Sequence, residues 1–349
     1  MTSRSGSALL NINGLKTHFF LDEGIVRAVD DVSFEVPRGK VLGVVGESGC
    51  GKSVLARSIM RLVRPPGRTV AGEILYHPSE TANGGSPIDL AKLDSDSREI
   101  RAVRGGGITM IFQEPMASFS LVYTVGQQII EGILNHQDVS KAEARNRTIE
   151  ILGRVGIPNP ELRIDDYPFR LSGGMRQRCM IAMALVNNPE LVIADEPTTA
   201  LDVTTQAQIL ELMTELQEEY GMAMMLITHN LGVVAQMAEE VIVMYLGKIV
   251  ERTDVKTLFS DPKHPYTQEL LKSIPKLGRT KQSEKLAAIA GTVPPAYLTP
   301  PGCSFHPRCP SVREGVCDGV VPDDVSIRPG HSVRCLLYSA GGQVGPAAA

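Results

Sequence analysis

Residues 46–53 read GESGCGKS, and this octapeptide follows a continuous apolar run, VLGVV, at residues 41–45. Such a run is typical of a strand buried on both faces, and the apolar spacing over 54–63 predicts a helix after the loop. Glycines in a strand–loop–helix unit let successive backbone N–H groups wrap phosphate oxygens, with a helix N-terminus behind them. The sequence therefore predicts a phosphate-binding loop on an α/β sheet, in preference to an ordinary glycine-rich turn. Its candidate residues are Gly46, Glu47, Ser48, Gly49, Cys50, Gly51, Lys52 and Ser53.

An acidic pair, Asp195 and Glu196, follows a second buried strand, LVIA, at residues 191–194. In a nucleotide site Lys52 would reach the β- and γ-phosphates, and Ser53 would bind Mg²⁺ through its hydroxyl. Asp195 would order the shell of the Mg²⁺ ion, and Glu196 would polarise the water that attacks the γ-phosphate. The alternative is that the two acids merely begin a solvated loop. A phosphate-binding loop needs an acidic partner, and this favours the nucleotide site.

Composition excludes several classes of protein. The chain has 349 residues, of which 43% are hydrophobic, so it has ample material for a globular core. Its formal net charge of -4 gives no general electrostatic footprint for nucleic acid, and we expect no nucleic-acid partner. No apolar run reaches the roughly 18 residues that cross a bilayer. The N-terminus lacks the apolar centre of a secretory signal, so we expect a cytoplasmic protein.

The order of patterns along the chain predicts one large α/β domain followed by a smaller region. We expect strands before residue 37, at 224–227 and at 241–245, with an amphipathic helix over 204–220. Residues 124–156 have the pattern of a helical insertion. Prolines become frequent after residue 259, so we place a boundary near Asp261. An exposed loop is expected at 78–86 and a disordered tail at the C-terminus.

Between the two halves of the predicted nucleotide site, residues 171–178 read LSGGMRQR. Ser172, Gly173 and Gly174 would open a helix with a hydroxyl and N–H groups facing an anion, although a simple helix cap explains them equally well. The segment resembles the signature of the ATPase subunits of ABC transporters, where the anion is the γ-phosphate held by the other subunit. The resemblance implies a P-loop NTPase core of the ABC ATPase type at 1–261, with a helical subdomain over 116–185.

Further positions match the motifs of this family in chain order. Gln113, in IFQEP, matches the glutamine that touches Mg²⁺ and the attacking water. Asp202, in TALD, matches the loop that links the two sites across the dimer, and His229, in ITHN, matches the switch histidine on the γ-phosphate. Phe19 resembles the aromatic residue that stacks on adenine, with Phe20 beside it as a competitor.

The resemblance assigns roles to these residues. Catalysis falls to Glu196, His229 and Gln113, and the Mg²⁺ ligands would be Ser53, Gln113 and Asp195. Because the residues whose loss marks degenerate sites in the family are present, we expect a half-site competent for ATP hydrolysis.

Cysteines crowd the last fifth of the chain, at positions 303, 309, 317 and 335. Together with HPYT at residues 264–267, this segment resembles the C-terminal extension of the dipeptide and oligopeptide importer branch, implying a small Cys-rich domain at 262–338 and a tail at 339–349. Four thiolates can hold a [4Fe–4S] cluster or a tetrahedral zinc, and the lack of a Cys-x-x-Cys knuckle favours the cluster. Paired disulfides or unrelated buried cysteines are the alternatives. We expect a cluster of Cys303, Cys309, Cys317 and Cys335 that staples a segment too poor in apolar residues to build its own core.

The phosphate loop and the signature lie too far apart in the family fold to serve the same nucleotide, so two cassettes would meet head to tail around ATP. The resemblance implies an ATP-binding and ATP-hydrolysing subunit of a peptide importer, using ATP and Mg²⁺ at the cytoplasmic face of the inner membrane. Its partners would be a second ABC ATPase subunit, identical or different, two transmembrane permease subunits and an extracytoplasmic substrate-binding protein. Nickel or sugar cargo, a soluble ABC ATPase outside transport, and a partner that binds ATP without hydrolysis are the alternatives.

Overall fold

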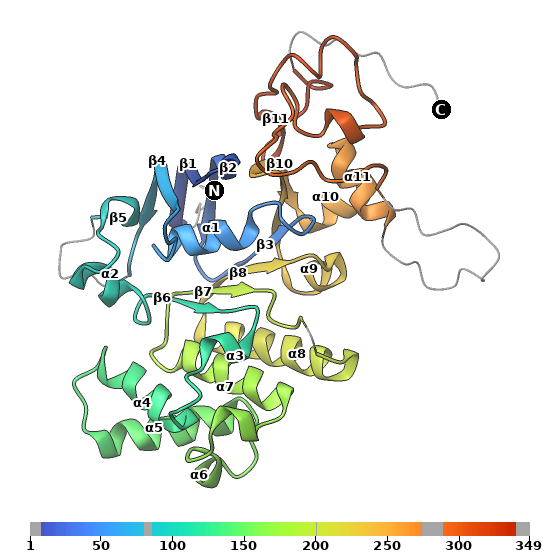
Figure 1. Ribbon diagram of the computed structural model, residues 1–349. Coiled ribbons are helices and arrows are strands. Elements are labelled where there is room, and N and C mark those ends of the chain that lie inside the picture. The colour runs from blue at the N-terminus through green and yellow to red at the C-terminus, as the bar shows by residue number, and fades with distance from the viewer. Residues whose placement is uncertain (1–7, 80–85, 200, 274–288, 340–349) are drawn as a thin grey trace, which may run out of the picture.

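The computed structural model describes residues 8–79, 86–199, 201–273 and 289–339. Most of the expected exposed loop at 78–86 and all of the expected disordered tail beyond residue 339 lie outside the described residues. Within the described ranges, an eight-stranded sheet runs through the centre of the molecule in the order β11-β12-β10-β9-β3-β8-β7-β6 (Figure 1). Its strands are β3 (Val41–Val45), β6 (Ile108–Ile111), β7 (Leu191–Asp195), β8 (Ala223–Thr228), β9 (Glu240–Tyr245), β10 (Lys248–Asp254), β11 (Val325–Arg328) and β12 (His331–Val333).

Strands β9, β3, β8, β7 and β6 pair in parallel. Every residue of β3, β7 and β8 is buried, which is why the sequence shows uninterrupted apolar runs there. The α/β fold class is therefore confirmed. Because the carboxyl ends of parallel strands meet at one edge, the loops after β3, β6, β7 and β8 converge on the same place.

An antiparallel sheet packs beside the central one, in the order β2-β1-β4-β5. The strands are β1 (Ala8–Leu21), β2 (Gly24–Pro37), β4 (Gly67–Tyr76) and β5 (Ile88–Asp89). The sequence predicts β1 and β2 but not β4, whose first residue, Gly67, follows two prolines. Gly67 lies opposite Phe19 in the register, and a Cβ there would come within 2.5 Å of the Phe19 ring. The glycine thus makes room for an aromatic side chain at this edge.

Helices cover both faces of the central sheet and fill the expected insertion. Side-chain hydrogen bonds cap the N-termini of several helices, including a capping box between Thr124 and Gln127 at the start of α4. Figure 1 shows α4, α5 and α6 at the opposite end of the molecule from β11. The helices are α1 (Lys52–Ile59), α2 (Arg98–Val103), α3 (Pro115–Ser118), α4 (Val125–Leu134), α5 (Lys141–Arg154), α6 (Pro160–Arg163), α7 (Gly173–Leu185), α8 (Val203–Tyr220), α9 (Leu231–Met237), α10 (Val255–Ser260) and α11 (Pro265–Lys272), with 3₁₀ turns η1 (Leu90–Lys92), η2 (Pro168–Arg170) and η3 (His306–Arg308).

Helices α3 to α7 occupy the range expected for a helical subdomain, while the boundaries at 116, 185 and 261 stay predictions. Among the described helices, none combines the length and the apolar character that crossing a bilayer requires.

The C-terminal region, residues 262–338, shares its core with the nucleotide-binding part of the chain. The rings of Tyr245 and Tyr266 have centroids 4.8 Å apart, and the Phe305 ring lies 5.2 Å from Tyr245 and 5.3 Å from Tyr266. Tyr245 is the last residue of β9, whereas Tyr266 and Phe305 belong to the C-terminal region. The C-terminal region therefore has a hydrophobic core, which it shares with residues of the central sheet.

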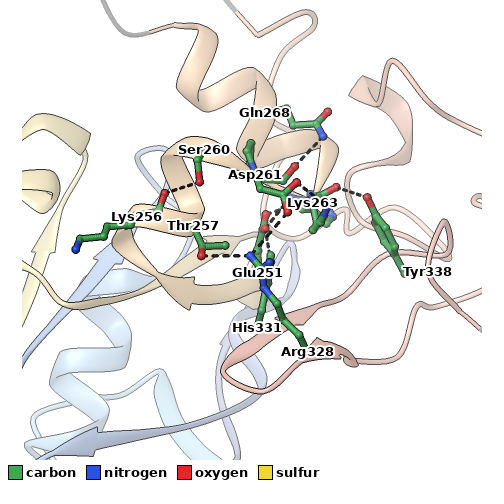
Figure 2. A network of polar contacts seen from close by, with 12 residues as sticks. Glu251, Lys256, Thr257, Ser260, Asp261, Lys263, Gln268, Arg328, His331 and Tyr338 are labelled. Atoms are coloured by element: carbon green, nitrogen blue, oxygen red, sulfur yellow. Dashed lines mark hydrogen bonds and ion pairs between the residues drawn. The ribbon is translucent and has the colours of Figure 1, made fainter. Parts of the chain in front are cut away.

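A polar network around Glu251 also connects β10 to the C-terminal region (Figure 2). The Glu251 side chain, on β10, is 0% exposed and accepts hydrogen bonds from His331 Nε2 at 2.9 Å, Lys263 N at 2.7 Å and His264 N at 2.9 Å. Tyr338 closes the network by donating to the Lys263 carbonyl at 3.2 Å. One carboxylate of β10 thus holds two separate stretches of the C-terminal region, residues 263–264 and His331, and β12 also pairs directly with β10.

Candidate nucleotide site

The phosphate-binding loop wraps the amino group of Lys52. Lys52 Nζ donates to the carbonyl of Gly46 at 2.8 Å and to that of Glu47 at 3.0 Å. Gly46 and Gly51 have φ values of 154° and 106°, and a Cβ on either would come within 2.3 Å of a backbone carbonyl oxygen. The glycines are therefore required by the close approach of neighbouring backbone, and the loop feeds directly into α1 as predicted.

Cys50 lies inside this loop and is almost fully buried, with its Sγ 3.7 Å from Lys52 Nζ. Burial raises the pKa of the Cys50 thiol, which keeps it uncharged beside the lysine. Cys50 is thus a small buried filler of the loop.

Ser53 and Asp195 face each other across the site. Ser53 Oγ donates to Asp195 Oδ1 at 3.1 Å, and Asp195, the last residue of β7, is only 3% exposed. Burial raises the pKa of Asp195 although the Ser53 hydrogen bond opposes that shift. A hydroxyl and a buried carboxylate are the oxygen ligands that Mg²⁺ prefers, so these residues fit the ion that the sequence predicts.

Glu196 is the meeting point of the candidate catalytic residues. Its carboxylate accepts hydrogen bonds from Gln113 Nε2 at 3.2 Å and from Thr199 Oγ1 at 2.8 Å, and it lies 3.1 Å from His229 Nδ1. Burial alone would raise the pKa of Glu196, but the bonds from Thr199 and His229 and the nearby positive charge of Lys52 hold it below its usual value. Thr199 was not predicted as a site residue, although its place three residues after Glu196 is visible in the sequence.

The backbone of Glu196 is unusual as well, because its φ of 49° lies in the left-handed region that non-glycine residues rarely adopt. Its N–H donates to the Ile227 carbonyl on the neighbouring strand at 2.9 Å, which holds the conformation. Such backbone strain is common at functional sites, where a side chain must be held in one orientation.

A pocket of about 290 Å³ lies over the phosphate loop. Phe19 lines it, whereas Phe20 does not and instead stacks under the Arg68 guanidinium at 4.4 Å. Ala296 and Thr299 also line the pocket, although they belong to the C-terminal region, and no sequence pattern predicts this contribution. The other lining residues are Val26, Arg27, Ala28, Ser48, Gly49, Gly51, Lys52, Ser53, Val54, Gln113, Glu196, Leu246 and Gly247.

The signature segment lies outside this pocket, on the surface. Ser172 caps α7 by accepting from Met175 N at 3.3 Å, and both Ser172 and Gly173 are exposed. Asp202, also exposed, caps α8 by accepting from Thr205 N at 3.0 Å. The starts of the two helices are neighbours, because a Cβ on Gly174 would come within 2.9 Å of Thr205. The structure brings Ser172, Gly174 and Asp202 together but leaves them apart from this chain's own nucleotide pocket.

The metal expectation for the C-terminal cysteines receives no support from the geometry. In the part of the chain that the structure describes, no three His, Cys, Asp or Glu side chains are arranged to hold one metal ion. Cys303, Cys309, Cys317 and Cys335 are all free thiols, so paired disulfides are not formed either. Burial first, and the neighbouring cysteines next, raise the pKa of Cys309 to about 11 and that of Cys335 to about 12.

Comparisons with known proteins identify the family of this chain. The ABC transporter family model matches residues 29–199, and the model of the oligopeptide/dipeptide transporter C-terminal region matches residues 250–317. The chain is 49% identical to the dipeptide transport ATP-binding protein DppD of Escherichia coli, over 94% of this chain and 96% of that protein. It is 46% identical to the oligopeptide transport ATP-binding protein AppD of Bacillus subtilis, over 96% of this chain and 98% of the relative.

Among solved structures, the dimeric structure of MJ0796, a bacterial ABC transporter cassette, matches with a TM-score of 0.61 and 27% identity. The match covers 70% of this chain and 98% of that one. With relatives this similar over nearly its whole length, the chain belongs to the ATP-binding proteins of ABC transporters, in the branch that carries the oligopeptide/dipeptide transporter C-terminal region.

Proposed function

We propose that this chain binds MgATP over the 46–53 loop and hydrolyses it to power the import of peptides through transmembrane partner subunits. The observation that carries the proposal is the convergence of Gln113, Thr199 and His229 on the carboxylate of Glu196, at the rim of a pocket floored by the phosphate loop. The relatives' names support peptides as the cargo, in preference to nickel or sugar.

Each residue has a defined part in this reaction. Backbone N–H groups of the loop and Lys52 bind the phosphates, and Phe19 stacks on adenine. Ser53, Asp195 and Gln113 would hold Mg²⁺, which screens the charge that builds up on the phosphates. Glu196 accepts the proton of the attacking water, and its lowered pKa keeps it ionised for that purpose. His229 holds Glu196 and reaches the γ-phosphate.

A second cassette completes the site. Ser172, Gly173 and Gly174 are exposed or half-exposed at the start of α7, where they can bind the γ-phosphate of ATP held by a partner subunit. Asp202 lies beside them and would link the two sites. We expect the pair to sit on two permease subunits at the cytoplasmic face of the inner membrane and to work with an extracytoplasmic substrate-binding protein. The second ATPase subunit is either another copy of this chain or a different one.

The Glu196→Gln variant tests the catalytic assignment. It removes the proton acceptor while keeping the shape of the side chain, so ATP turnover should fall by roughly 10² to 10⁴-fold and MgATP binding should persist. The Lys52→Ala variant is the matched control, because it should lose binding itself. Turnover by Glu196→Gln at the rate of the unmodified protein would contradict the proposal.

The four C-terminal cysteines stay candidates for a [4Fe–4S] cluster, with zinc as the alternative. What supports them is that Cys303 N donates to the Cys317 carbonyl at 2.8 Å and that Cys303, Cys317 and Leu336 belong to one buried cluster, against which Cys309 packs. Iron and acid-labile sulfide at about four of each per chain, in protein purified without oxygen, would support the cluster. Protein free of iron, sulfide and zinc would assign these thiols to packing alone.

A further inference from the structure

The C-terminal region touches the phosphate-binding loop at Glu47, the loop's second residue. Arg308, at the end of η3, donates two hydrogen bonds to the Glu47 carboxylate. Its Nη1 lies 2.7 Å from Oε2, and its Nη2 lies 3.1 Å from Oε1. The Arg308 side chain is only 4% exposed, and 261 residues separate the two partners in sequence. The Glu47 side chain is partly exposed, and a bidentate pair of this kind fixes both the position and the orientation of the carboxylate.

The backbone of Glu47 is held from the same side. Its N–H donates to the Tyr266 hydroxyl at 2.8 Å. Tyr266 is fully buried on α11, whose first turn is capped by His264 Nδ1 accepting from Tyr266 N at 3.0 Å. Burial lowers the pKa of His264 to about 3, so its ring is neutral and free to accept that bond. The HPYT segment thus supplies a rigid hydroxyl to the phosphate loop.

The negative charge of Glu47 lies in the phosphate-binding loop, and Arg308 compensates it. A carboxylate in a loop that binds a triphosphate repels the ligand, because like charges in a poorly hydrated site are weakly screened. Paired with a buried arginine, the carboxylate is neutralised and turned toward the C-terminal region. The Glu47 carbonyl stays on the loop side, where it accepts from Lys52 Nζ.

Arg308 is itself held in place. Its Nε donates to the Ala290 carbonyl at 3.1 Å, and Nη1 lies 3.5 Å from the Tyr245 hydroxyl. Residues 296 and 299, in the segment that leads from Ala290 toward Arg308, line the nucleotide pocket. The C-terminal region therefore meets the nucleotide site at two points, the loop and the pocket wall.

We propose that Arg308 and Tyr266 are positioning residues of the ATP site, through which the C-terminal region neutralises Glu47 and holds the phosphate loop ready for MgATP. This inference rests on the proposed function, since it assumes that MgATP binds the loop. It gives the C-terminal region a direct part in nucleotide affinity.

The test is the MgATP dissociation constant of the full chain, measured by calorimetry for a double-mutant cycle. Arg308→Gln leaves Glu47 ionised and unpaired, and should weaken MgATP binding on the order of tenfold. Glu47→Gln, and the double variant Glu47→Gln with Arg308→Gln, should both bind within about threefold of the unmodified chain, because neither keeps a carboxylate in the loop that would repel the phosphates. A merely structural role for Arg308 predicts the reverse, with the double variant binding no better than Arg308→Gln.

Two further variants keep the test decisive. Arg334→Gln is the matched control, because Arg334 also joins the C-terminal region to the rest of the chain, pairing with Asp31 at 3.3 Å, without touching the loop. Its MgATP affinity should not change. Arg308→Lys keeps the charge but loses the bidentate contact, so it should bind MgATP more weakly than the unmodified chain and more tightly than Arg308→Gln.

The proposal is overturned if Arg308→Gln binds MgATP as Arg334→Gln does, or if the double variant fails to recover. If either result occurs while the unmodified chain binds MgATP and Lys52→Ala does not, the positioning role is wrong but the proposed function stands. Absence of MgATP binding by the unmodified chain would instead overturn the proposed function.

Discussion

Asp195 and Glu196 are adjacent carboxylates whose surroundings push their pKa values in opposite directions. Burial raises the pKa of Asp195, whereas hydrogen bonds from Thr199 and His229 outweigh burial and lower that of Glu196. The difference matches their proposed work. Ionisation of the buried Asp195 costs free energy unless a bound cation compensates its charge, whereas Glu196 must be ionised to accept a proton from water.

The raised pKa of Asp195 makes a prediction about stability without nucleotide. The folded chain binds this proton more tightly than the unfolded chain, so the Asp195 contribution to the free energy of unfolding falls as pH rises from the ordinary aspartate range through the raised value. Asp195→Asn removes that cost. Its free energy of unfolding should exceed that of the unmodified chain at neutral pH, and the difference should vanish at acid pH.

Urea unfolding at several pH values, without Mg²⁺ or nucleotide, measures this effect. Asp202→Ala is the contrasting variant, since Asp202 is an exposed helix cap whose pKa is lowered by its bonds to Thr205. Its loss should reduce stability at neutral pH. A stability of Asp195→Asn at or below that of the unmodified chain across the whole pH range would refute the interpretation of Asp195.

At the scale of elements, the sequence predicts what local patterns determine. Strands β3, β7, β8 and β9 follow from continuous apolar runs, and the loops at their carboxyl ends follow from glycine and acidic residues placed directly after them. β11 and β12 are short and mostly polar, so no pattern marks them, and the prolines before β4 hide its start. The register that joins β12 to β10 depends on tertiary contacts that no local pattern encodes.

The same distinction holds within the site. Gln113, Glu196 and His229 each follow a strand, so their convergence could be predicted from the parallel sheet. Thr199 could be found only as a neighbour of Glu196. The pairing of Glu47 with Arg308 could not be predicted, because two segments 261 residues apart meet through a shared core.

The joint between β10 and β12 has its own test. The Glu251 carboxylate is buried and accepts three hydrogen bonds, whereas the amide of Glu251→Gln would place its NH₂ group against at least one of the three donors. The free energy of unfolding should therefore fall by about 3 kcal/mol. Urea unfolding measures the loss, and limited proteolysis should show faster cleavage in the C-terminal region.

The control for this joint is Glu240→Gln, on β9. Glu240 pairs with Arg252 at 3.0 Å but is half-exposed, so its loss should cost at most about 1 kcal/mol. Equal effects of the two variants would show that the buried network does not hold the C-terminal region in place.

At the scale of the whole molecule, the proposed function gives one chain halves of two different nucleotide sites. The phosphate loop and the catalytic residues gather at the edge of the sheet, whereas Ser172 and Gly173 are exposed on the surface and do not line that pocket. On the proposed function, the chain supplies the phosphate loop to one ATP and the signature to another, so hydrolysis should depend on a second cassette.

ATP turnover per chain, measured across a dilution series, tests this central claim most directly. Turnover should fall as the chain is diluted, or should arise only when a different partner ATPase subunit is added, and Ser172→Arg should abolish it without loss of MgATP binding. Full turnover that stays constant down to the lowest concentration of the isolated chain, and that survives Ser172→Arg, would contradict the account.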